Sequence, residues 1–421
     1  MRIAILSDGI PPESTGGAET IAWSLAQGLR SAGHEVHLIT ATPGRSFEEP
    51  RGGIATYHLH SAQPARWKQY TGLYNPATIG PLRALLTRLR PDLVNAHNVQ
   101  NELSWFSLVV AHRLGIPTVW NSHDLSAIMV GRMAHFVDPT DLNPRPLVDY
   151  HLPALHDLRR MRLRWNPLRV PLVRSIVSAS ADVRVSVSQA HAAALTANGI
   201  PALQVVHNGI DLARFSAVDP ASVDALRRRF GLVDRPVVLF AGRLRREKGS
   251  TQLVEALDIL ASRVRDVALL VLADRGFKRG GRLQRKFPAV FEKHVVESGW
   301  LQGDELVAAY HLADVVTTPS VYLDPFPTVN LEAMAAGRPL VTTCFGGSPE
   351  AIADGQTGYV INPFDTASLA GRLEALLLDE NLRRSLGEAG SRRAQENFSL
   401  ERYVSAMLEI YQAARPPRTA G

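Results

Sequence analysis

The sequence has very little cysteine and no long apolar run. Its single cysteine, Cys344, excludes an internal disulfide, and no HExxH pair offers a zinc site. The apolar runs stay shorter than the roughly 18 residues of a membrane-spanning helix. The first run, MRIAIL, ends near Asp8, before a signal-peptide core could form. The protein is therefore expected in the cytoplasm.

Low-complexity segments and an unusual composition are also lacking. With 45% hydrophobic and 20% charged residues, the chain has ordinary globular usage, which excludes disordered and fibrous classes. Its 421 residues exceed the size at which one core stops growing, so we predict two domains of about 200 residues each. The +6 charge is dispersed except in residues 159–174, which hold six arginines and no acid. Two interpretations stay open for this segment: a solvated helix face or a contact with an anionic surface.

Apolar runs of strand length alternate with segments of helical period, which is typical of a parallel sheet covered on both faces. The predicted strands cover residues 3–7, 36–40, 93–97, 118–122 and 183–188, then 203–207, 237–242, 268–273, 294–299, 315–320 and 339–343. The pattern starts again after the loop TANGIPA. We predict an α/β protein with two doubly wound, Rossmann-like domains, residues 1–200 and 201–398, that face each other across a cleft. A final helix and tail, residues 399–421, would pack back toward the first domain.

In such sheets ligands bind beyond the carboxyl ends of the strands, so loops that follow a strand are the candidate sites. The first is SDGIPPESTGGAET, before a helix predicted over residues 19–31. There Gly16 and Gly17 expose bare amides at a helix start, where a phosphate could bind. A turn that needs positive φ would use the same glycines, so both interpretations remain.

The second candidate loop is AGRLRREKGS, directly after a predicted strand. It lacks the glycine that precedes the lysine in a P-loop, because Glu247 takes that place, so nucleotide hydrolysis is disfavoured. Arg243 and Lys248 could hold a diphosphate, the arginine as a fork and the lysine as a point charge. The alternative is a solvated basic loop.

The third candidate is VYLDPFPTVNLEAMAAG, which places Asp324 and Glu332 eight residues apart. Two prolines stiffen the turn, and Thr328 is predicted to cap the following helix, which leaves the amides near Val329 and Asn330 facing the cleft. Glu332 then lies in the first turn of this helix. Its carboxylate suits either the helix dipole or the paired hydroxyls of a ribose.

Two histidines, His97 and His123, each follow a predicted strand, in VNAHN and WNSHD. Both would look into the cleft from the first domain, although histidines packed at a sheet edge are also common. In VHNGID, Asn208 and Gly209 open the second domain on a tight turn.

Taken together, GGAE, HNGID, GRLRREKG, PS, DPFPTVNLEAMAAG, GGSPE and DGQTGYV resemble, in order and spacing, the retaining glycosyltransferases of family 4, which have the GT-B fold. The resemblance covers nearly the whole chain. It is strong over residues 205–365 and looser over residues 40–180, where the family varies with its acceptors.

The resemblance implies transfer of a sugar from a nucleotide diphosphate donor, usually UDP- or GDP-linked, to an acceptor hydroxyl with retained anomeric configuration. It implies that Arg243 and Lys248 hold the diphosphate and that Glu332 holds the ribose hydroxyls. It further implies that the amides around Thr328 and Val329 hold the distal phosphate.

The same resemblance assigns the remaining site residues. Main-chain groups near Trp300 and Leu301 would read the base, and Gly16 and Gly17 would close on the phosphate. His123 resembles the histidine that lines the donor sugar. The donor-binding set is completed by Asn208 and Asp324, and His123, Asp324, Arg243 and Lys248 are the predicted catalytic residues.

The implied mechanism needs no metal and no cofactor, and the sequence contains no DxD motif. Fixed cations and helix termini would stabilise the charge that develops on the leaving diphosphate, whose oxygen would accept the acceptor's proton. One position departs from the family, which usually has Glu where this chain has Asp324. The shorter arm indicates a different donor sugar, a shifted pose or a tolerated change.

Three rival hypotheses stay open: a nucleotide-sugar 2-epimerase, a phosphorylase, and a non-catalytic subunit that binds sugar nucleotides. The expected partners are a nucleotide sugar and a carbohydrate, lipid-linked or small-molecule acceptor, with no nucleic acid. The arginine-rich segment also has an apolar stripe, formed by Leu155, Leu158, Met161 and Trp165. This stripe suggests peripheral contact with an anionic membrane at its inner face.

Overall fold

The computed structural model describes residues 1–14, 16–153, 156–161, 165–242, 244–272 and 281–414. The chain forms two compact units. The first unit contains Met1–Met133, Tyr150–Gly209 and Leu400–Gly421, and the second contains Ala134–Asp149 and Ile210–Ser399. Among the described residues, no helix combines the length and the apolar character that crossing a membrane requires.

This division differs from the predicted domains in two places. Residues 201–209 group with the first unit, and Ala134–Asp149 leaves the amino-terminal half to join the second. Contacts within the second unit explain the transfer, because the Asn362 side chain donates hydrogen bonds to the carbonyl oxygens of Asp141 and Asn143 at 2.8 and 2.9 Å. Phe136 also packs edge-on against Phe345, with ring centroids 5.8 Å apart. Contacts between such distant segments leave no local signal in the sequence.

The first unit is built on one eight-stranded sheet with the order β3-β4-β2-β1-β5-β6-β7-β8. Its strands are β1 (Arg2–Leu6), β2 (Glu35–Thr42), β3 (Phe47–Arg51), β4 (Ile54–His60), β5 (Leu93–Ala96), β6 (Thr118–Ser122), β7 (Val183–Ser186) and β8 (Leu203–Val205). All neighbours pair in parallel except β3, which runs antiparallel to β4. The central strands β5 and β6 are buried along their whole length, as expected of a sheet covered on both faces.

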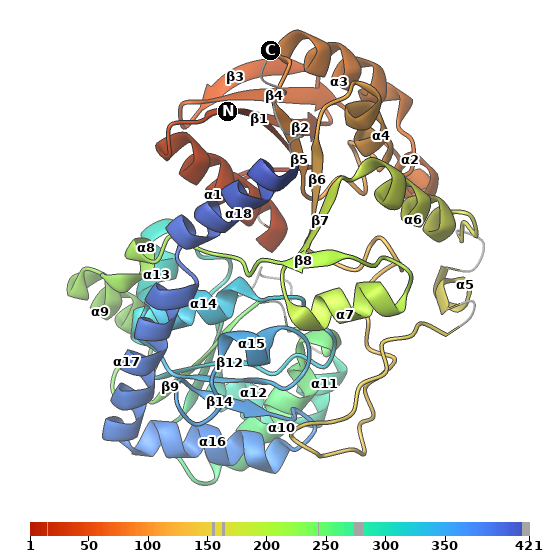
Figure 1. Ribbon diagram of the computed structural model, residues 1–421. Helices are drawn as coiled ribbons and strands as arrows, with labels where there is room; N and C mark the ends of the chain where they lie inside the picture. Colours follow the sequence, from red (N-terminus) through yellow and green to blue (C-terminus); the bar gives the residue numbers. More distant parts are fainter. Residues whose placement is uncertain (15, 154–155, 162–164, 243, 273–280, 415–421) are drawn as a thin grey trace. The chain divides into compact units, whose positions relative to one another are not determined.

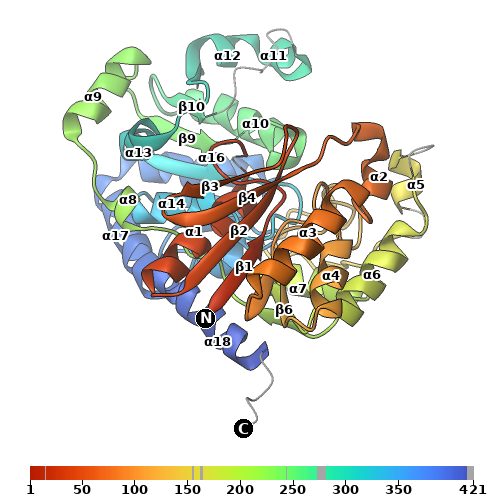
Figure 2. The ribbon, with the colours of Figure 1, turned by 90° about the horizontal axis from the view of Figure 1, so that it is seen from above.

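The helices of the first unit are α1 (Gly17–Ser31), η1 (Ala65–Trp67), α2 (Lys68–Thr71), α3 (Pro76–Leu89), α4 (Phe106–Arg113), α5 (His156–Met161), α6 (Arg169–Ser180), α7 (Gln189–Ala197) and α18 (Leu400–Ala414). Helices α3, α4 and α6 pack side by side, and α18 lies along α1 (Figures 1 and 2). Close approach of the last pair needs Gly28, where an added Cβ would lie 2.5 Å from the Val404 side chain. Tyr411 of α18 accepts a hydrogen bond at 2.6 Å from Asn95, which joins the end of the chain to the centre of the sheet.

The second unit has a six-stranded, fully parallel sheet with the order β11-β10-β9-β12-β13-β14. Its strands are β9 (Val237–Ala241), β10 (Ala268–Leu272), β11 (Val295–Glu297), β12 (Val315–Thr318), β13 (Leu340–Thr343) and β14 (Tyr359–Ile361). Its helices are α8 (Ala213–Ser216), α9 (Pro220–Arg229), η3 (Arg246–Lys248), α10 (Ser250–Ala261), α11 (Arg282–Lys286), α12 (Pro288–His294), α13 (Gly303–Leu312), α14 (Thr328–Ala335), α15 (Ser348–Ala351), α16 (Thr366–Leu378) and α17 (Glu380–Asn397).

The core of the second unit explains why these segments form strands and helices. Val238 and Phe240 of β9 pack with buried residues of α10, α12 and α16 on one face of the sheet. Leu239, between them, is fully buried and points to the opposite face, which α13 and α14 cover. Both faces are therefore apolar, and the strand reads as a continuous hydrophobic run.

Three observed strands, β3, β4 and β14, were absent from the prediction. The β3 sequence FEEPR is largely polar and forms the edge of its sheet, where one side needs no partner. β14 has only three residues and is also an edge strand. Short edge strands such as β3 and β14 carry too few alternating apolar residues to be recognised from sequence, whereas β4 has seven residues and lies inside its sheet, so this reason does not apply to it.

Of the six arginines in the arginine-rich segment, the structure describes the side chains of Arg169 and Arg174. The described helices are α5 (His156–Met161) and α6 (Arg169–Ser180). Arg169 is buried and donates a hydrogen bond to the carbonyl oxygen of Ser126 at 2.7 Å, and burial lowers its pKa. Leu155 and residues 162–164 lie outside the described residues.

Candidate active site

Three loops of the second unit meet at the carboxyl edge of its sheet, after β9, β12 and β13. Gly249 has a φ of 77°, and an added Cβ there would lie 1.8 Å from the Pro319 carbonyl oxygen. Gly346 has a φ of 71°, and its Cβ would lie 2.2 Å from the Asp324 carbonyl oxygen. Both positions therefore need glycine for conformation and for space. The amide of Gly347 donates to the same Asp324 oxygen at 2.9 Å, which joins the second and third loops.

Lys248 and Asp324 form an ion pair at this meeting point. The Lys248 Nζ lies 2.7 Å from the Asp324 Oδ2, and Asp324 is 7% exposed. Lys248 also lies over the Tyr322 ring, 5.2 Å from its centroid. Burial alone would lower the pKa of Lys248, but the Asp324 carboxylate and Tyr322 raise it above its ordinary value. The structure thus brings together two predicted site residues that lie 76 positions apart and keeps the lysine cationic.

Glu332 lies on α14 with its carboxylate held by Tyr310 of α13. The Tyr310 hydroxyl donates a hydrogen bond to Glu332 Oε2. Burial raises the pKa of Glu332, while hydrogen bonds from Tyr310 and Thr328 oppose that rise. Tyr310 was not predicted as a site residue, because an aromatic on the apolar stripe of a helix normally indicates core.

The predicted cap of α14 is wrong in one respect. Thr328 is the first residue of the helix, and Pro327 occupies the cap position without a side-chain hydrogen bond. Thr328 instead bonds to Glu332, one turn further on. The first amides of the helix, including that of Val329, have no acceptor within the helix, as at any helix start.

The prediction named the amide near Asn330 but assigned no role to the Asn330 side chain. This side chain is fully buried, accepts a hydrogen bond from Thr318 at 2.9 Å and donates one to Ser348 at 3.2 Å. These bonds tie α14 to the end of β12 and to α15. An asparagine inside a helix gives no local sign of such a role, because its two partners come from other segments.

The remaining predicted site residues of this part of the chain are Trp300, Leu301 and Arg243. Trp300 and Leu301 follow β11, the edge strand, and Trp300 is 46% exposed whereas Leu301 is buried. Arg243 lies outside the described residues.

In the first unit, Gly16 occupies the cap position of α1 and Gly17 begins the helix. No side chain caps this helix start, and a Cβ on Gly17 would meet nothing within 4 Å. The preceding strand leads to Asp8, whose carboxylate accepts hydrogen bonds from the amides of residues 101–103 at 2.7 to 3.0 Å. Asp8 thereby fixes the loop after β5 beside the loop after β1.

His97 and His123 follow β5 and β6 and contact each other. Nδ1 of His97 lies 2.7 Å from Nε2 of His123, and the rings stack with centroids 5.0 Å apart. Burial lowers the pKa of His97 to about 3 and that of His123 well below its ordinary value. One ring must therefore donate to the other while both stay neutral. His97 Nε2 and His123 Nδ1 have no hydrogen-bond partner within the described part of the chain.

Two further observations complete the first unit. His191 of α7 reaches the Asp124 carbonyl oxygen at 3.0 Å, directly after His123, and the sequence prediction did not include it. Asn208 is buried near the last residue of the unit.

A pocket of about 700 Å³ lies at the carboxyl edge of the first sheet. It is lined by the loops that follow β1, β2, β4 and β5, and it contains four acids and one lysine: Asp8, Glu13, Glu19, Glu102 and Lys68. Burial raises the pKa of Asp8 to about 7, so the negative charge at neutral pH comes mainly from the three glutamates.

Comparisons with known proteins show the family of this chain. Residues 15–214 match the family described as Glycosyltransferase Family 4, and residues 222–393 match Glycosyl transferases group 1. The D-inositol 3-phosphate glycosyltransferase of Salinispora arenicola is 32% identical over 80% of this chain and 72% of its own length. The glycogen synthase of Mycobacterium tuberculosis is 28% identical over 99% of this chain and 95% of its own length.

Solved structures share the fold. The sucrose-phosphate synthase of Thermosynechococcus elongatus aligns with a TM-score of 0.73 and 22% identity, over 98% of both chains. HepE from Anabaena, in complex with UDP-glucose, aligns with a TM-score of 0.70 and 18% identity, over 98% of this chain and 100% of its own. Two doubly wound units with these sites define a glycosyltransferase of the GT-B type. More particularly, the chain belongs to the family 4 glycosyltransferases.

Proposed function

We propose that this glycosyltransferase transfers a sugar from a nucleotide diphosphate donor, a UDP- or GDP-sugar, to an acceptor hydroxyl with retained anomeric configuration. The observation that carries the proposal is the Lys248–Asp324 pair, held by three loops at the carboxyl edge of the second sheet, two of which require a glycine. A fixed cation beside a helix start suits a diphosphate. The UDP-glucose in the HepE complex, a protein of the same fold, supports this donor class.

The diphosphate would bind between Lys248, Arg243 and the amino end of α14. Lys248 is the residue best placed to neutralise the leaving group, because its raised pKa keeps it charged at any physiological pH. The first amides of α14, at Thr328 and Val329, would hold the distal phosphate. These groups would neutralise the diphosphate without a divalent metal, so we propose a metal-independent reaction with no cofactor.

The nucleoside would bind on the other side of α14. Tyr310 orients Glu332, whose carboxylate is suited to the paired hydroxyls of a ribose. Main-chain groups near Trp300 and Leu301, after the edge strand β11, would contact the base.

Asp324 would contact the donor sugar in the second unit. Neutral His123, held by its bond to His97, can share a hydrogen bond with a sugar hydroxyl without adding charge. In the reaction the bond from the anomeric carbon to the diphosphate oxygen breaks, and the bond to the acceptor oxygen forms on the same face. The acceptor's proton passes to the departing phosphate oxygen, so no protein base is needed. Gly16, Gly17 and Asn208 would contribute main-chain or amide contacts to the donor.

The acceptor would bind in the pocket of the first unit. Glu13, Glu19 and Glu102 line it, and Lys68 is the single cation among its lining residues. Glu13 pairs with Arg51 and Glu102 pairs with Lys68, so these two carboxylates add little net negative charge. We expect an uncharged polyol as acceptor, whose hydroxyls the carboxylate oxygens can bind. Transfer to glucose rather than to glucose 6-phosphate would support this choice, and the reverse preference would contradict it.

Peripheral membrane contact is proposed for the surface around α2. Trp67 and Tyr70 are 51% and 48% exposed, and Lys68 lies between them in the sequence. Asn166 donates to the Gln69 carbonyl oxygen, which places exposed Leu168 in the same region. Exposed aromatic rings beside cations suit an anionic headgroup layer. Sedimentation with vesicles that contain or lack phosphatidylglycerol tests this, and equal sedimentation would remove the idea.

The central experiment incubates the purified chain with UDP-glucose, GDP-mannose and a panel of hydroxyl acceptors, with EDTA present, and follows the product by NMR. An α-linked product from an α-linked donor supports the proposal. Conversion of the donor sugar without an acceptor would instead support a 2-epimerase, and phosphate-dependent cleavage of a glycan would support a phosphorylase. Donor binding without turnover by the chain alone would favour a non-catalytic subunit.

A further inference from the structure

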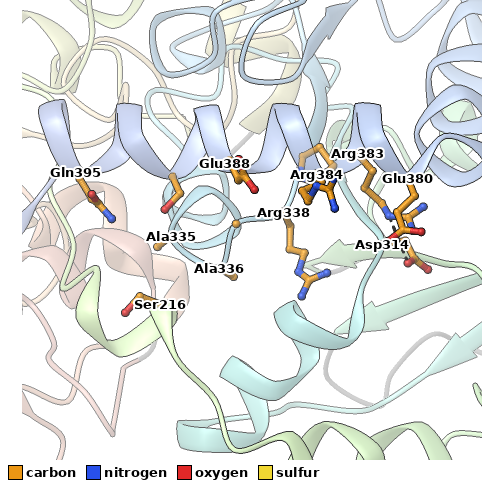
Figure 3. Close-up of a pocket in the computed structure, with 13 residues that line it drawn as sticks. Ser216, Asp314, Ala335, Ala336, Arg338, Glu380, Arg383, Arg384, Glu388 and Gln395 are labelled. Atoms are coloured by element: carbon orange, nitrogen blue, oxygen red, sulfur yellow. Dashed lines mark ion pairs between the residues drawn. The ribbon is translucent and has the colours of Figure 1, made fainter.

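A second pocket of the catalytic chain, of about 550 Å³, lies at the amino edge of the sheet in the second unit (Figure 3). It is bounded by the turn from α14 to β13, by α17, by Ser216 of α8 and by Asp314, just before β12. The sheet is parallel, so this edge is opposite the carboxyl edge that carries Lys248 and Asp324. The pocket is thus separate from the proposed donor site, and its volume suits a small molecule.

One end of the pocket is rich in charged side chains, with three arginines beside Asp314 and Glu380 (Figure 3). Arg338, Arg383 and Arg384 point toward this end from the α14–β13 turn and from α17 (Figure 3). The Arg338 side chain has no hydrogen-bond or ion-pair partner among the described residues, although its Nε is buried. A buried donor without a partner requires an explanation, such as a bound ligand or water.

The acids of the pocket do not supply this partner. Asp314 accepts a hydrogen bond from the Val237 amide at 2.8 Å and pairs with Arg383 Nε at 3.9 Å. Glu380 and Glu388 are exposed on α17, where solvent screens them. Burial lowers the pKa of Arg338, Asp314 partly offsets this, and nearby arginines lower it further. A guanidinium nevertheless stays charged at neutral pH, so Arg338 is a cation without a direct hydrogen-bond or ion-pair partner among the described residues.

The other end of the pocket is neutral and polar. Ser216 and Gln395 lie at the end away from Arg383, and Ser391 lines the same pocket from α17 (Figure 3). Ala335 and Ala336 supply a small apolar wall between the two ends. Hydroxyls and an amide can donate to and accept from the hydroxyls of a carbohydrate. The lining therefore matches a molecule with an anion at one end and hydroxyls at the other.

We propose that this pocket binds a small phosphorylated carbohydrate, with its phosphate at Arg338 and its hydroxyls at Ser216, Ser391 and Gln395. Arginine presents paired N–H donors that match phosphate oxygens, which favours phosphate at this end. The pocket shares α14 with the proposed donor site, since Ala335 ends the helix that carries Glu332. The ligand site does not depend on the proposed transfer reaction.

Calorimetric titration of the full chain with glucose 6-phosphate, at fixed pH and ionic strength, tests the proposal. We expect binding to the wild type that is at least about tenfold weaker in Arg338→Gln, because a charge-assisted bond is lost. Arg228→Gln removes an exposed arginine of α9 outside the pocket and should bind as the wild type does. Arg384→Gln, at an exposed position on α17, should also weaken binding and guards against misfolding of the Arg338 variant.

Two further variants test separately the contact with the carbohydrate and the location of the site. Gln395→Ala should weaken glucose 6-phosphate but leave inorganic phosphate unchanged, and Lys248→Ala should leave glucose 6-phosphate binding intact. The proposal is overturned if the wild type shows no heat of binding at millimolar ligand, or if both arginine variants bind normally. Loss of binding in Lys248→Ala would likewise overturn it, because the ligand would then occupy the donor site. Equal affinity for inorganic phosphate and glucose 6-phosphate would show that the pocket does not recognise the carbohydrate.

Discussion

The two units share the same layered α/β architecture, but the carboxyl edge of one sheet holds a charged pair of side chains and that of the other holds a neutral pair. In the second unit, a lysine with a raised pKa pairs with an aspartate. In the first, two stacked histidines have lowered pKa values and stay neutral. The strands are buried and apolar in both units, so the contrast comes from the loops.

This contrast indicates a division of labour in the proposed reaction. A fixed cation suits the diphosphate, where negative charge increases as the bond breaks. Neutral imidazoles suit a sugar, whose hydroxyls need hydrogen bonds but no charge. Variants that remove the Lys248 charge in the second unit should therefore differ in effect from variants that change the neutral histidine pair in the first unit.

The largest effect is expected from Lys248→Ala. We expect transfer to slow by about 100-fold or more and donor affinity to fall, because the developing charge loses its nearest cation. Steady-state kinetics with the best donor measure both. The matched control is Lys286→Ala, which removes a lysine from an exposed pair with Glu255 and should change little. Normal turnover by the Lys248 variant would show that transfer does not need the charge of Lys248.

The neutral histidine pair of the first unit predicts that the stability of the folded protein depends on pH. His97 has a pKa of about 3 in the folded state against 6.5 ordinarily, so the unfolded chain binds more protons between these values. Stability should therefore fall as the pH falls through this window, by about 2 kcal/mol per such histidine at pH 5. Urea unfolding at pH 7 and pH 5 measures this through Trp105 and Trp120, which are buried in the first unit.

The control for this effect is a double variant, His97→Gln with His123→Gln, which cannot titrate in this range. It should lose less stability than the wild type between pH 7 and pH 5. An identical loss in both proteins would show that the histidine pair is not the cause.

A smaller effect is expected from Glu332→Gln. The amide keeps an oxygen for Tyr310 but loses the charge that binds the ribose hydroxyls, so donor affinity should fall by about tenfold. Comparing UDP-glucose with its 2′-deoxyuridine analogue sharpens the test. The variant should distinguish the two donors less than the wild type does, and an unchanged ratio would contradict the ribose assignment.

The smallest effect is expected from Asp324→Glu, which gives the chain the usual family residue. The longer arm can still reach Lys248, so we expect the rate with the best donor to change by roughly threefold at most. Ranking UDP- and GDP-sugars for both proteins measures donor choice. A changed ranking would identify Asp324 as a specificity residue, and an unchanged one would make it a tolerated replacement.

Much of the candidate site could be predicted because its residues lie in loops directly after recognisable strands. Lys248, Asp324, His97 and His123 were predicted in this way, and Glu332 was predicted from the helix that directly follows such a loop. The roles of the Tyr310 and Asn330 side chains could not be predicted, because each acts through a partner from another segment. Thr328 was assigned the wrong role at its helix end, since a proline can occupy the cap position without a side-chain bond.

By itself the sequence determined the fold class and the family, because apolar periodicity and short motifs are local properties of the chain. The tertiary structure decided which of these residues meet. It placed Lys248 against Asp324 and stacked His97 on His123. It also moved Ala134–Asp149 into the second unit and left the Arg338 Nε without a hydrogen-bond partner among the described residues. These outcomes depend on packing between segments far apart in the chain, and burial among those segments sets the pKa values and the partners.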